Sequence, residues 1–299
     1  MKGSFRMAKF ALSAFADEAG SSLAEQIEAL KANDIDYIEP RNVDKTGILN
    51  IPEKELIAIK TELDKNGIKV NSLGSPIGKY PIDEPFESHL EAFERALRAC
   101  EILGTKNMRM FSFFVEQEHL AEKRDEVLSR MNSLVAIAKE RGIDLCHENE
   151  SKIYGCLPSE VADLLDNVPG LYGIFDPANY RMNGADCIEG INATFKNLKY
   201  LHIKDAIYES KTIVPAGEGE GQIARVIDMV NEHTDDVVYL TLEPHLHVFD
   251  AYASIDDHEL KGRHKFANNR EAFDFAACAL KKLLTENGYK RNGENLWIK

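Results

Sequence analysis

Short apolar runs alternate with longer amphipathic stretches along almost the whole chain. Apolar runs of about four to eight residues are typical of buried strands, and apolar residues three or four positions apart are typical of helices. We expect strands at Phe10–Phe15, Tyr37–Glu39, Ile68–Leu73, Asn107–Phe113, Ile143–Glu148, Tyr172–Asp176, Leu198–Lys204 and Val237–Glu243. We expect helices at Ser22–Ala32, Glu53–Lys65, Phe86–Leu103, Leu120–Arg141, Pro158–Leu165, Met182–Phe195, Gln222–Glu232 and Phe266–Leu284.

Strands that alternate with helices indicate a parallel sheet, because a parallel connection needs a covering crossover. The eight units predicted here are the number that closes an α/β (β/α)8 TIM barrel. An open doubly wound sheet is the alternative, but no G-x-G-x-x-G motif follows the first strand. We therefore expect a single TIM-barrel domain over residues 1–299. Residues 1–6 are expected to be poorly ordered, and the insertion at residues 244–263 is expected to lie over the barrel mouth.

Composition narrows the classes of partner. The chain has 299 residues with 50 acidic and 36 basic side chains, a formal net charge of −14. This acidic balance argues against nucleic acid and against a membrane surface, which attract basic faces. Five cysteines show no C-x-x-C spacing, and no apolar stretch approaches the length of a membrane span. We expect a soluble cytoplasmic protein, and the sequence leaves open whether it forms a homo-oligomer.

Four of the later predicted strands carry a residue that can bind metal at their ends: Glu148, Asp176, His202 and Glu243. A single acidic residue there is usually a helix cap or a solvated loop residue, but four successive strand ends form a pattern. In a barrel these ends converge on the mouth, where carboxylates would repel one another without a cation. The pattern predicts one divalent metal ion, with Mn²⁺ or Mg²⁺ favoured by the oxygen-rich set and Zn²⁺ or Co²⁺ permitted.

The chain resembles the xylose-isomerase-like TIM-barrel superfamily of sugar and sugar-phosphate isomerases and epimerases. The motifs that carry the resemblance are Phe15-Ala16-Asp17-Glu18, Gly74-Ser75-Pro76-Ile77-Gly78-Lys79, Glu148-Asn149, Asp176-Pro177-Ala178-Asn179, His202-Ile203-Lys204-Asp205, Gly217-Glu218-Gly219-Glu220-Gly221 and Leu242-Glu243-Pro244-His245. The resemblance implies that Glu148 and Glu243 bind metal and also act as the acid/base pair on a small carbohydrate. A metal-stabilised enediolate is the expected intermediate, because a proton α to a carbonyl is too weakly acidic to leave unaided.

The chain departs from the ketohexose 3-epimerases of this superfamily at three positions. Those enzymes carry a histidine three residues after the aspartate ligand, where this chain has Asn179. Their acidic residue six positions after the first glutamate corresponds to Tyr154, and their arginine six positions after the histidine corresponds to Tyr208. The metal ligands are retained but the residues that orient a ketohexose are not, so free ketohexoses are doubtful substrates.

Five further residues near the predicted mouth are candidates for contacting substrate: Lys204, Lys79, Asn179, Glu39 and Arg109. Each has a plainer interpretation. Lys204 could form a local ion pair with an aspartate, and Lys79 could be a solvated loop lysine. Glu39 could pair with Arg41 or orient a metal ligand, and Arg109 could balance the carboxylates inside the barrel.

Neighbouring residues have expected supporting roles. Asp205 is expected to support His202. His147 should point to the opposite side of its strand from Glu148 and pack in the core, because side chains alternate along a strand. We interpret His245 and His247 as loop residues and not as ligands of a second metal. The glycine-rich segment 217–221 contains two glutamates that would repel an anion, so we expect a mobile flap and not a phosphate cradle.

Three other functions compete. A dehydratase of the inosose type would use the same metal site and expel a β-hydroxyl, and the mass of the product would distinguish it. An apurinic endonuclease is remote, because that chemistry uses additional histidines at the second and third strands and the chain has none there. A non-catalytic binding barrel stays open, because a fold does not imply a function.

Overall fold

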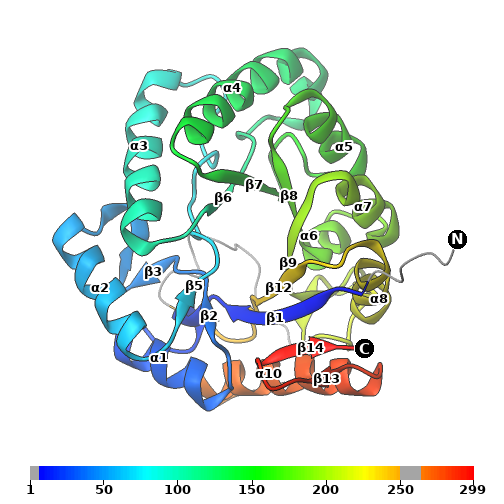
Figure 1. The fold of residues 1–299 in the computed structure, drawn as a ribbon. Helices are drawn as coiled ribbons and strands as arrows, with labels where there is room; N and C mark the ends of the chain where they lie inside the picture. Colours follow the sequence, from blue (N-terminus) through cyan, green and yellow to red (C-terminus); the bar gives the residue numbers. More distant parts are fainter. Residues whose placement is uncertain (1–6, 250–263) are drawn as a thin grey trace, which may run out of the picture.

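The computed structural model describes residues 7–249 and 264–299. Parallel strands form a ring that helices surround (Figure 1). The strands of the ring are β1 (Lys9–Ala14), β2 (Tyr37–Ile38), β5 (Lys69–Val70), β6 (Asn107–Met110), β7 (Asp144–Glu148), β8 (Tyr172–Phe175), β9 (Leu198–Ile203) and β12 (Val237–Leu242). The predicted α/β barrel is confirmed. The expectations for residues 1–6 and for most of 244–263 lie outside the described residues.

Parallel ladders join the ring in the order β5, β2, β1, β12, β9, β8, β7 and β6. The last gap, between β5 and β6, is closed by a parallel bridge between Leu73 and Met108. There Leu73 donates its N–H to Asn107 O at 2.9 Å, and Arg109 donates its N–H to Leu73 O at 2.9 Å. The carboxyl ends of all these strands therefore share one end of the ring, which is the end where a barrel builds its site.

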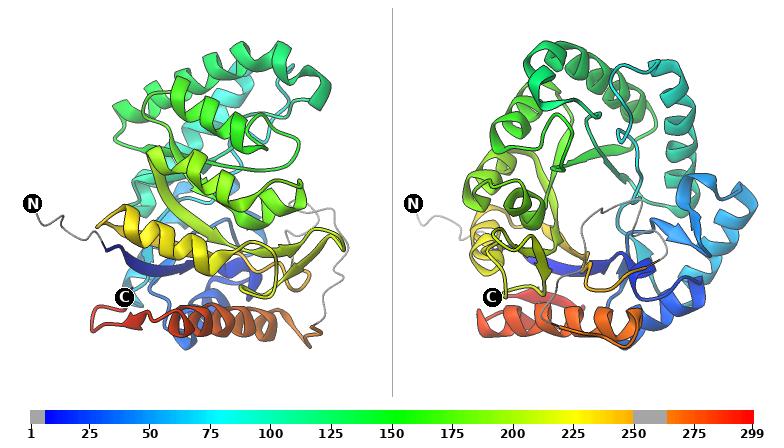
Figure 2. Two further views of the ribbon diagram at one scale, coloured as in Figure 1. Left: turned by 90° about the vertical axis from the view of Figure 1, so that its right-hand side faces the viewer. Right: turned by 180° about the vertical axis from the view of Figure 1, so that it is seen from behind.

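The helices form an outer layer that all three ribbon views show (Figures 1 and 2). They are α1 (Leu23–Ala32), α2 (Glu53–Lys65), α3 (Phe86–Leu103), α4 (Leu120–Glu140), α5 (Pro158–Asn167), α6 (Pro177–Met182), α7 (Cys187–Thr194), α8 (Ile223–His233) and α10 (Asn269–Glu286). Local signals set their ends. The capping box of Ser22 and Glu25 begins α1, and Gly104, at φ 73°, ends α3. Among the described residues no helix is long and apolar enough to cross a membrane.

One predicted helix, Met182–Phe195, was wrong at its start, because α6 ends at Met182 and a second helix, α7, begins at Cys187. Asp176 caps α6 and Pro177 occupies its first turn, so that helix begins earlier than the periodicity indicated. Gly184, at φ 74°, then breaks the helix, and Asp186 caps α7 by accepting two backbone hydrogen bonds. The early start of α6 matters for the site, because it fixes Asp176 at a helix terminus.

Short antiparallel pairs were missed by the sequence pattern. They are β3 (Asn42–Val43) with β4 (Thr46–Gly47), β10 (Asp205–Ile207) with β11 (Thr212–Val214), and β13 (Lys290–Arg291) with β14 (Leu296–Ile298). Strand β14 pairs with Phe10 and Ala11 of β1, whereas β2 pairs with Ser13 and Ala14. The C-terminal hairpin thus continues the pairing of β1 along a stretch that the two-residue strand β2 does not reach.

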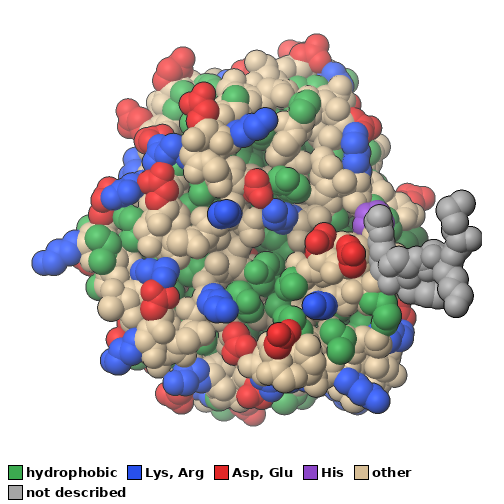
Figure 3. All heavy atoms as spheres, in the orientation of Figure 1, with side chains coloured by type: hydrophobic (Ala, Val, Ile, Leu, Met, Phe, Trp, Pro, Cys, Tyr) green, Lys and Arg blue, Asp and Glu red, His purple; other side chains and the backbone are tan. Residues whose placement is uncertain are grey.

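The face of the molecule in Figure 3 carries acidic and basic side chains intermixed over its helices. No continuous basic stripe crosses this face, in keeping with the formal net charge of −14.

Inside the ring, a buried polar layer joins three strands. Ser13 Oγ donates to Asn71 Oδ1 at 2.7 Å, and Asn71 Nδ2 donates to Thr241 Oγ1 at 3.3 Å. Thr241 is in register with His202 of the neighbouring strand, so this layer lies at the level where the site begins.

Candidate metal centre

The four predicted metal ligands come together at the carboxyl ends of their strands. Glu148 is the last residue of β7, Asp176 follows β8, His202 lies in β9 and Glu243 follows β12. Each offers one ligand atom, and these atoms all lie within 4.8 Å of one another. All four side chains are buried. We call this set the cage; its geometry could hold one metal ion.

Two cage oxygens lack the hydrogen bonds that a buried carboxylate normally receives. Asp176 Oδ2 and Glu243 Oε2 accept none in the described part of the chain. Their charged neighbours are the Lys204 ammonium, with Nζ 3.0 Å from the Asp176 oxygen and 3.6 Å from the Glu243 oxygen, and His202, with Nδ1 3.4 Å from the Glu243 oxygen. Buried polar atoms without partners call for an unseen water or ion. The set of three carboxylates and one imidazole therefore fits a divalent cation.

The electrostatics of the cage are those of a crowded buried ionic cluster. Burial raises the pKa of Asp176 to about 6, although Lys204 opposes the shift. Burial would also raise the pKa of Glu148, but His202 and Arg109 outweigh it and lower this pKa to about 2. In the same way, Lys204 and His202 overcome burial and hold the pKa of Glu243 well below its usual range. Both glutamates are therefore carboxylates near neutral pH, as metal ligands must be.

The imidazole of His202 is held between two carboxylates. Its Nδ1 lies 3.0 Å from Glu148 Oε1, within the cage, and its Nε2 lies 3.4 Å from Glu39 Oε2. Tyr200 in turn donates its hydroxyl to Glu39 Oε1 at 2.8 Å. A carboxylate on the outer nitrogen fixes the ring and its tautomer, so Nδ1 is the nitrogen that faces the cage.

Each cage glutamate also has an arginine of its own. Arg109 NH1 lies 3.2 Å from Glu148 Oε2. Arg41 NH1 lies 3.0 Å from Glu243 Oε1, and the rest of its guanidinium pairs with Asp17 and Glu18. Of the two interpretations of Glu39, the contact with His202 favours orientation of a metal ligand, whereas Arg41 turns toward the loop after β1.

Two asparagines brace the cage. Asn149 Oδ1 accepts the Asp176 N–H at 2.9 Å, and Asn149 Nδ2 donates to Asp176 O at 3.0 Å, which ties the ends of β7 and β8 together. Asn179 donates its N–H to Asp176 Oδ1 and its Nδ2 to Glu148 Oε1 at 3.3 Å. With Oδ1 engaged in capping α6, Asp176 presents Oδ2 to the cage. The role of Asn149 was missed, since its partner lies on another strand.

The five predicted substrate-contacting residues all lie at or beside the cage. Lys204, Arg109, Glu39 and Asn179 contact cage side chains directly. Lys79 lies farther out, where its Nζ is 3.1 Å from Glu150 Oε2. The structure thus assembles the predicted set, and the contact of these residues with a substrate stays a prediction.

Asp205 has a different place from the one expected. Its Oδ2 accepts the N–H groups of Gly217 at 2.9 Å and Gly219 at 3.0 Å, and its Oδ1 accepts that of Gly221 at 2.8 Å. The side chain therefore anchors the glycine-rich segment and does not support His202. Asp205 holds the segment 217–221 in this structure, and its movement as a flap stays a prediction. A sequence cannot reveal this bond, because the acceptor and its donors are more than ten positions apart.

Two histidines behave as expected. His147 turns away from the cage, and its Nε2 lies 2.8 Å from Ser112 Oγ in the core. His245 packs near Glu18 and Glu243, and these three residues form a second group that could hold a cation. The guanidinium of Arg41 already lies 3.2 Å from Glu18 Oε1 and 3.0 Å from Glu243 Oε1. That positive charge argues against a second metal ion at this place.

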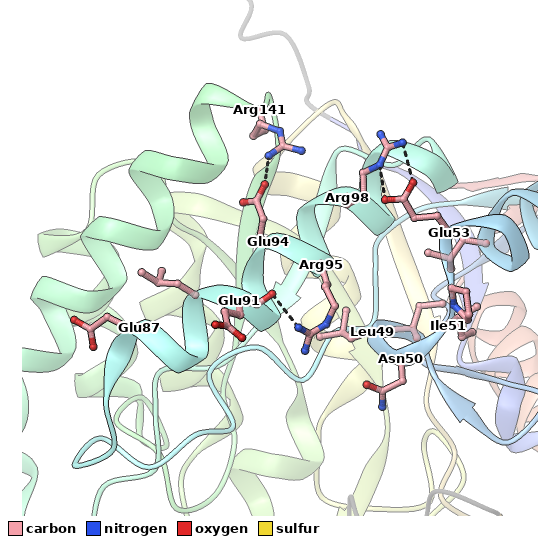
Figure 4. Close-up of a pocket in the computed structure, with 14 residues that line it drawn as sticks. Leu49, Asn50, Ile51, Glu53, Glu87, Glu91, Glu94, Arg95, Arg98 and Arg141 are labelled. Carbon is pink, nitrogen blue, oxygen red and sulfur yellow. Dashed lines mark hydrogen bonds and ion pairs between the residues drawn. The ribbon is translucent and has the colours of Figure 1, made fainter.

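A hollow of about 1130 Å³ lies on the outside of the barrel, between α2, α3 and the short helical turn η2 (Ile48–Asn50). Figure 4 shows that its arginines turn to protein groups: Arg98 to Glu53, Arg141 to Glu94, and Arg95 to the carbonyl of Glu91. None of the residues that line it belongs to the cage. The hollow is therefore separate from the candidate metal centre.

The fold and site define a class: an α/β barrel with a buried carboxylate–histidine cage at the carboxyl ends of its strands. The chain belongs to the xylose isomerase-like TIM barrel family, whose model matches residues 27–253. No curated protein matches the sequence.

Solved structures share the fold at low sequence identity. A zinc-bound IOLI protein has a TM-score of 0.69 and 15% identity, covering 93% of this chain and 99% of that one. D-Psicose 3-epimerase, solved in the presence of D-fructose, has a TM-score of 0.68 and 18% identity, covering 93% and 99%. The probable 3-DHS dehydratase AsbF from Bacillus anthracis has a TM-score of 0.68 and 16% identity, covering 91% and 98%. At such identities the likeness shows the fold alone.

Proposed function

We propose that this chain is a divalent-metal-dependent isomerase or epimerase that acts on a small carbohydrate with a carbonyl group. The observation that carries the proposal is the cage itself, in which four strand ends bring Glu148, Asp176, His202 and Glu243 within 4.8 Å of one another. Membership of the family and the likeness to D-psicose 3-epimerase support it. The same four residues would hold the cation, with Mn²⁺ or Mg²⁺ favoured by the three carboxylates.

A bound divalent cation would polarise the carbonyl and neighbouring hydroxyl of the substrate and so acidify the adjacent C–H bond. The protein supplies the groups that move the proton. Glu148 and Glu243 are both carboxylates near neutral pH, so either can accept the proton from carbon. Delivery of that proton by the same carboxyl group to the neighbouring carbon gives an isomer. An epimer forms if the second glutamate, after taking up a proton from water, delivers it to the opposite face of the carbon, and the first glutamate then releases its proton to water.

Three cationic side chains hold this machinery in place. Arg109 and Arg41 each fix one oxygen of a glutamate, which leaves the other oxygen to face the cage. The Lys204 ammonium is buried beside Asp176, and its pKa is raised well above the usual value because burial is outweighed by Asp176 and Glu243. Lys204 therefore stays charged and can donate a hydrogen bond to a substrate oxygen on which negative charge develops.

A dehydratase is the second candidate, and Lys204 is the observation that favours it. A charged ammonium beside the cage could hold the β-hydroxyl of the substrate by a hydrogen bond while the glutamate that took the proton from carbon gives it to that hydroxyl, which then leaves as water. The likeness to the probable 3-DHS dehydratase shows that this barrel also occurs in a protein given that activity.

One assay separates these reactions. The Mn²⁺-loaded protein would be incubated with ketopentoses, their phosphate esters and inososes, and the products weighed by mass spectrometry. We expect a product with the mass of the substrate and, in D₂O, one deuterium incorporated at carbon. A product lighter by one water would establish the dehydratase. If none of these compounds is converted with any metal tested, both proposals are overturned in favour of a binding barrel.

A further inference from the structure

We propose that the ion pair between Lys79 and Glu150 selects substrates whose far end carries hydroxyl groups, and rejects those that carry phosphate. The inference rests on the proposed function, because it concerns the end of the substrate that the cage does not hold. It decides between the sugar and the sugar phosphate, two classes that the sequence leaves open.

The pair lies at the mouth beside the cage. Lys79 follows the third strand of the ring and Glu150 lies two residues after Glu148, with Lys79 Nζ 3.1 Å from Glu150 Oε2. Their side chains are 19% and 17% exposed, so the pair is largely but not fully shielded from water. The Phe111 ring connects the pair to the cage, because its centre lies 4.6 Å from Lys79 Nζ and 5.2 Å from the guanidinium carbon of Arg109, the partner of Glu148. A substrate held at the cage would therefore extend past this pair.

Glu150 compensates the charge of Lys79, which, unlike Lys204 and Arg109, pairs with no cage carboxylate. Lys79 Nζ also lies 4.6 Å from the centre of the Phe111 ring, which gives the ammonium a second partner. A phosphate at this position would gain the attraction of Lys79 but meet the repulsion of Glu150. A hydroxyl can donate to the carboxylate and accept from the ammonium at once. The pair thus favours a polar uncharged group and opposes a charged one.

The other cations around the cage are also compensated. Arg41 pairs with Asp17, Glu18 and Glu243, while Arg109 pairs with Glu148 and Lys204 pairs with Asp176. Within the described residues, the carboxylates of this region outnumber its lysines and arginines by seven to four: Asp17, Glu18, Glu39, Glu148, Glu150, Asp176 and Glu243 against Arg41, Arg109, Lys79 and Lys204. A divalent cation would bring this balance close to neutral and leave no surplus positive charge for a phosphate dianion.

The backbone amides of the glycine-rich segment 217–221, which could cradle a phosphate, are already occupied. Asp205 fills the concavity of the glycine-rich segment and accepts the N–H groups of Gly217, Gly219 and Gly221. The fit is close, because a Cβ on Gly219 would lie 2.3 Å from Asp205 Oδ1. Such a nest of amides normally binds an anion, and here the anion is part of the chain. This segment therefore offers no phosphate site.

The test compares matched neutral and phosphorylated ligands with the Mn²⁺-loaded protein. Ribitol and ribitol 5-phosphate cannot react, so calorimetry reports their binding without any turnover. D-Ribulose and D-xylulose with their 5-phosphates report kcat/KM. In the wild type we expect the neutral member of each pair to be favoured at least tenfold. Glu150→Gln leaves Lys79 uncompensated. It should reduce that preference at least fivefold, by raising the affinity and the kcat/KM for the phosphate ester.

Asp144→Asn is the matched control, because it breaks a similar ion pair, Lys199 with Asp144 at 2.8 Å, at the opposite end of β7. It should leave the neutral-to-phosphate ratio unchanged. Tighter binding of ribitol 5-phosphate than of ribitol by the wild type, or an unchanged ratio in Glu150→Gln, would overturn the inference. So would failure of both alcohols to bind. If the alcohols bind as expected and no ketose is converted, the inference stands and the proposed catalytic function fails.

Discussion

Two buried clusters of similar composition share Glu243, and they differ in how their negative charge is balanced. In the first, Asp17, Glu18 and Glu243 surround the guanidinium of Arg41, which bonds to all three. In the second, the cage, Asp176 Oδ2 and Glu243 Oε2 accept no hydrogen bond among the described residues. The guanidinium of Arg41 completes the first cluster, whereas Arg109 and Lys204 pair with the cage carboxylates and still leave these two oxygens without a hydrogen bond. Burial and acidity are common to both clusters, so the unsatisfied oxygens are what favours the cage as the metal site.

The largest expected effect comes from replacing Glu148, a cage carboxylate that does not belong to the Arg41 cluster and that we propose takes the proton from carbon. Glu148→Gln should lower kcat by roughly 10³-fold, because an amide cannot accept the proton from carbon. The fold should persist, since the amide oxygen can still accept the hydrogen bond from Arg109 and only the longer bond from Asn179 is lost. Kinetics and thermal unfolding measure the two outcomes, with the exposed Glu116→Gln as control. A kcat within twofold of the wild type would remove Glu148 as the base.

Breaking the first cluster should affect stability. Arg41→Met leaves three buried carboxylates without their cation, and we expect the free energy of unfolding to fall by roughly 3–5 kcal/mol. Urea unfolding measures it. Arg109→Met serves as the matched variant in the cage, where added Mn²⁺ can replace part of the lost charge. If Mn²⁺ restores the stability of Arg41→Met as fully as that of Arg109→Met, the two clusters do not differ as described.

The buried histidine His147 contrasts with His202, whose pKa is raised well above its usual value because Glu148 and Glu39 outweigh burial. Burial lowers the pKa of His147 to about 4. The unfolded chain therefore binds a proton near its usual pKa of about 6.5 while the folded chain does not, so His147 contributes stability above pH 6.5 that is lost as the pH falls toward 4. Replacing it removes that dependence. Between pH 6.5 and 5, His147→Gln should lose stability more slowly than the wild type, by about 1–2 kcal/mol in total. If the free energy of unfolding falls with pH at the same rate in the wild type and in His147→Gln, His147 is not neutral in the folded protein.

The last prediction concerns Glu39, the residue behind His202. Glu39→Leu removes the acceptor for Nε2–H and should weaken metal binding by roughly 10–100-fold. Glu39→Gln should weaken it less, because the amide oxygen still accepts this hydrogen bond. Competition with a chromophoric chelator measures both affinities. Equal losses in the two variants would show that Glu39 acts through its charge and not by orienting the ring.

The sequence predicted most where local signals are strong. The bounds of α2 and α3 agree with the pattern to the residue, because both helices are amphipathic and each follows a proline. The cage ligands could be named because parallel strands in a barrel must end on the same side. By contrast, β5 covers only Lys69–Val70 of the predicted strand Ile68–Leu73, since a buried run does not say how many of its residues pair.

The supporting contacts could not be predicted. Arg41 and Glu243 are 202 positions apart, and Asn149 clamps a backbone that belongs to another strand. Such bonds depend on which side chains meet across the barrel, and one sequence carries no signal for that meeting. Asp205 was misplaced for this reason. Its position close to His202 in the chain suggested a contact between the two side chains, but Asp205 lies in the hairpin β10–β11 and bonds to the glycine-rich segment instead.

The central claim is that the cage, and not its neighbour, takes a metal ion. Metal content after purification without added metal, followed by Mn²⁺ titration of the metal-free protein, tests it most directly. The account predicts one equivalent of divalent metal per chain, lost in Asp176→Asn because that residue presents one of the two unsatisfied oxygens. A chain that binds no divalent metal, or an Asp176→Asn variant that binds it with undiminished affinity, would contradict the account.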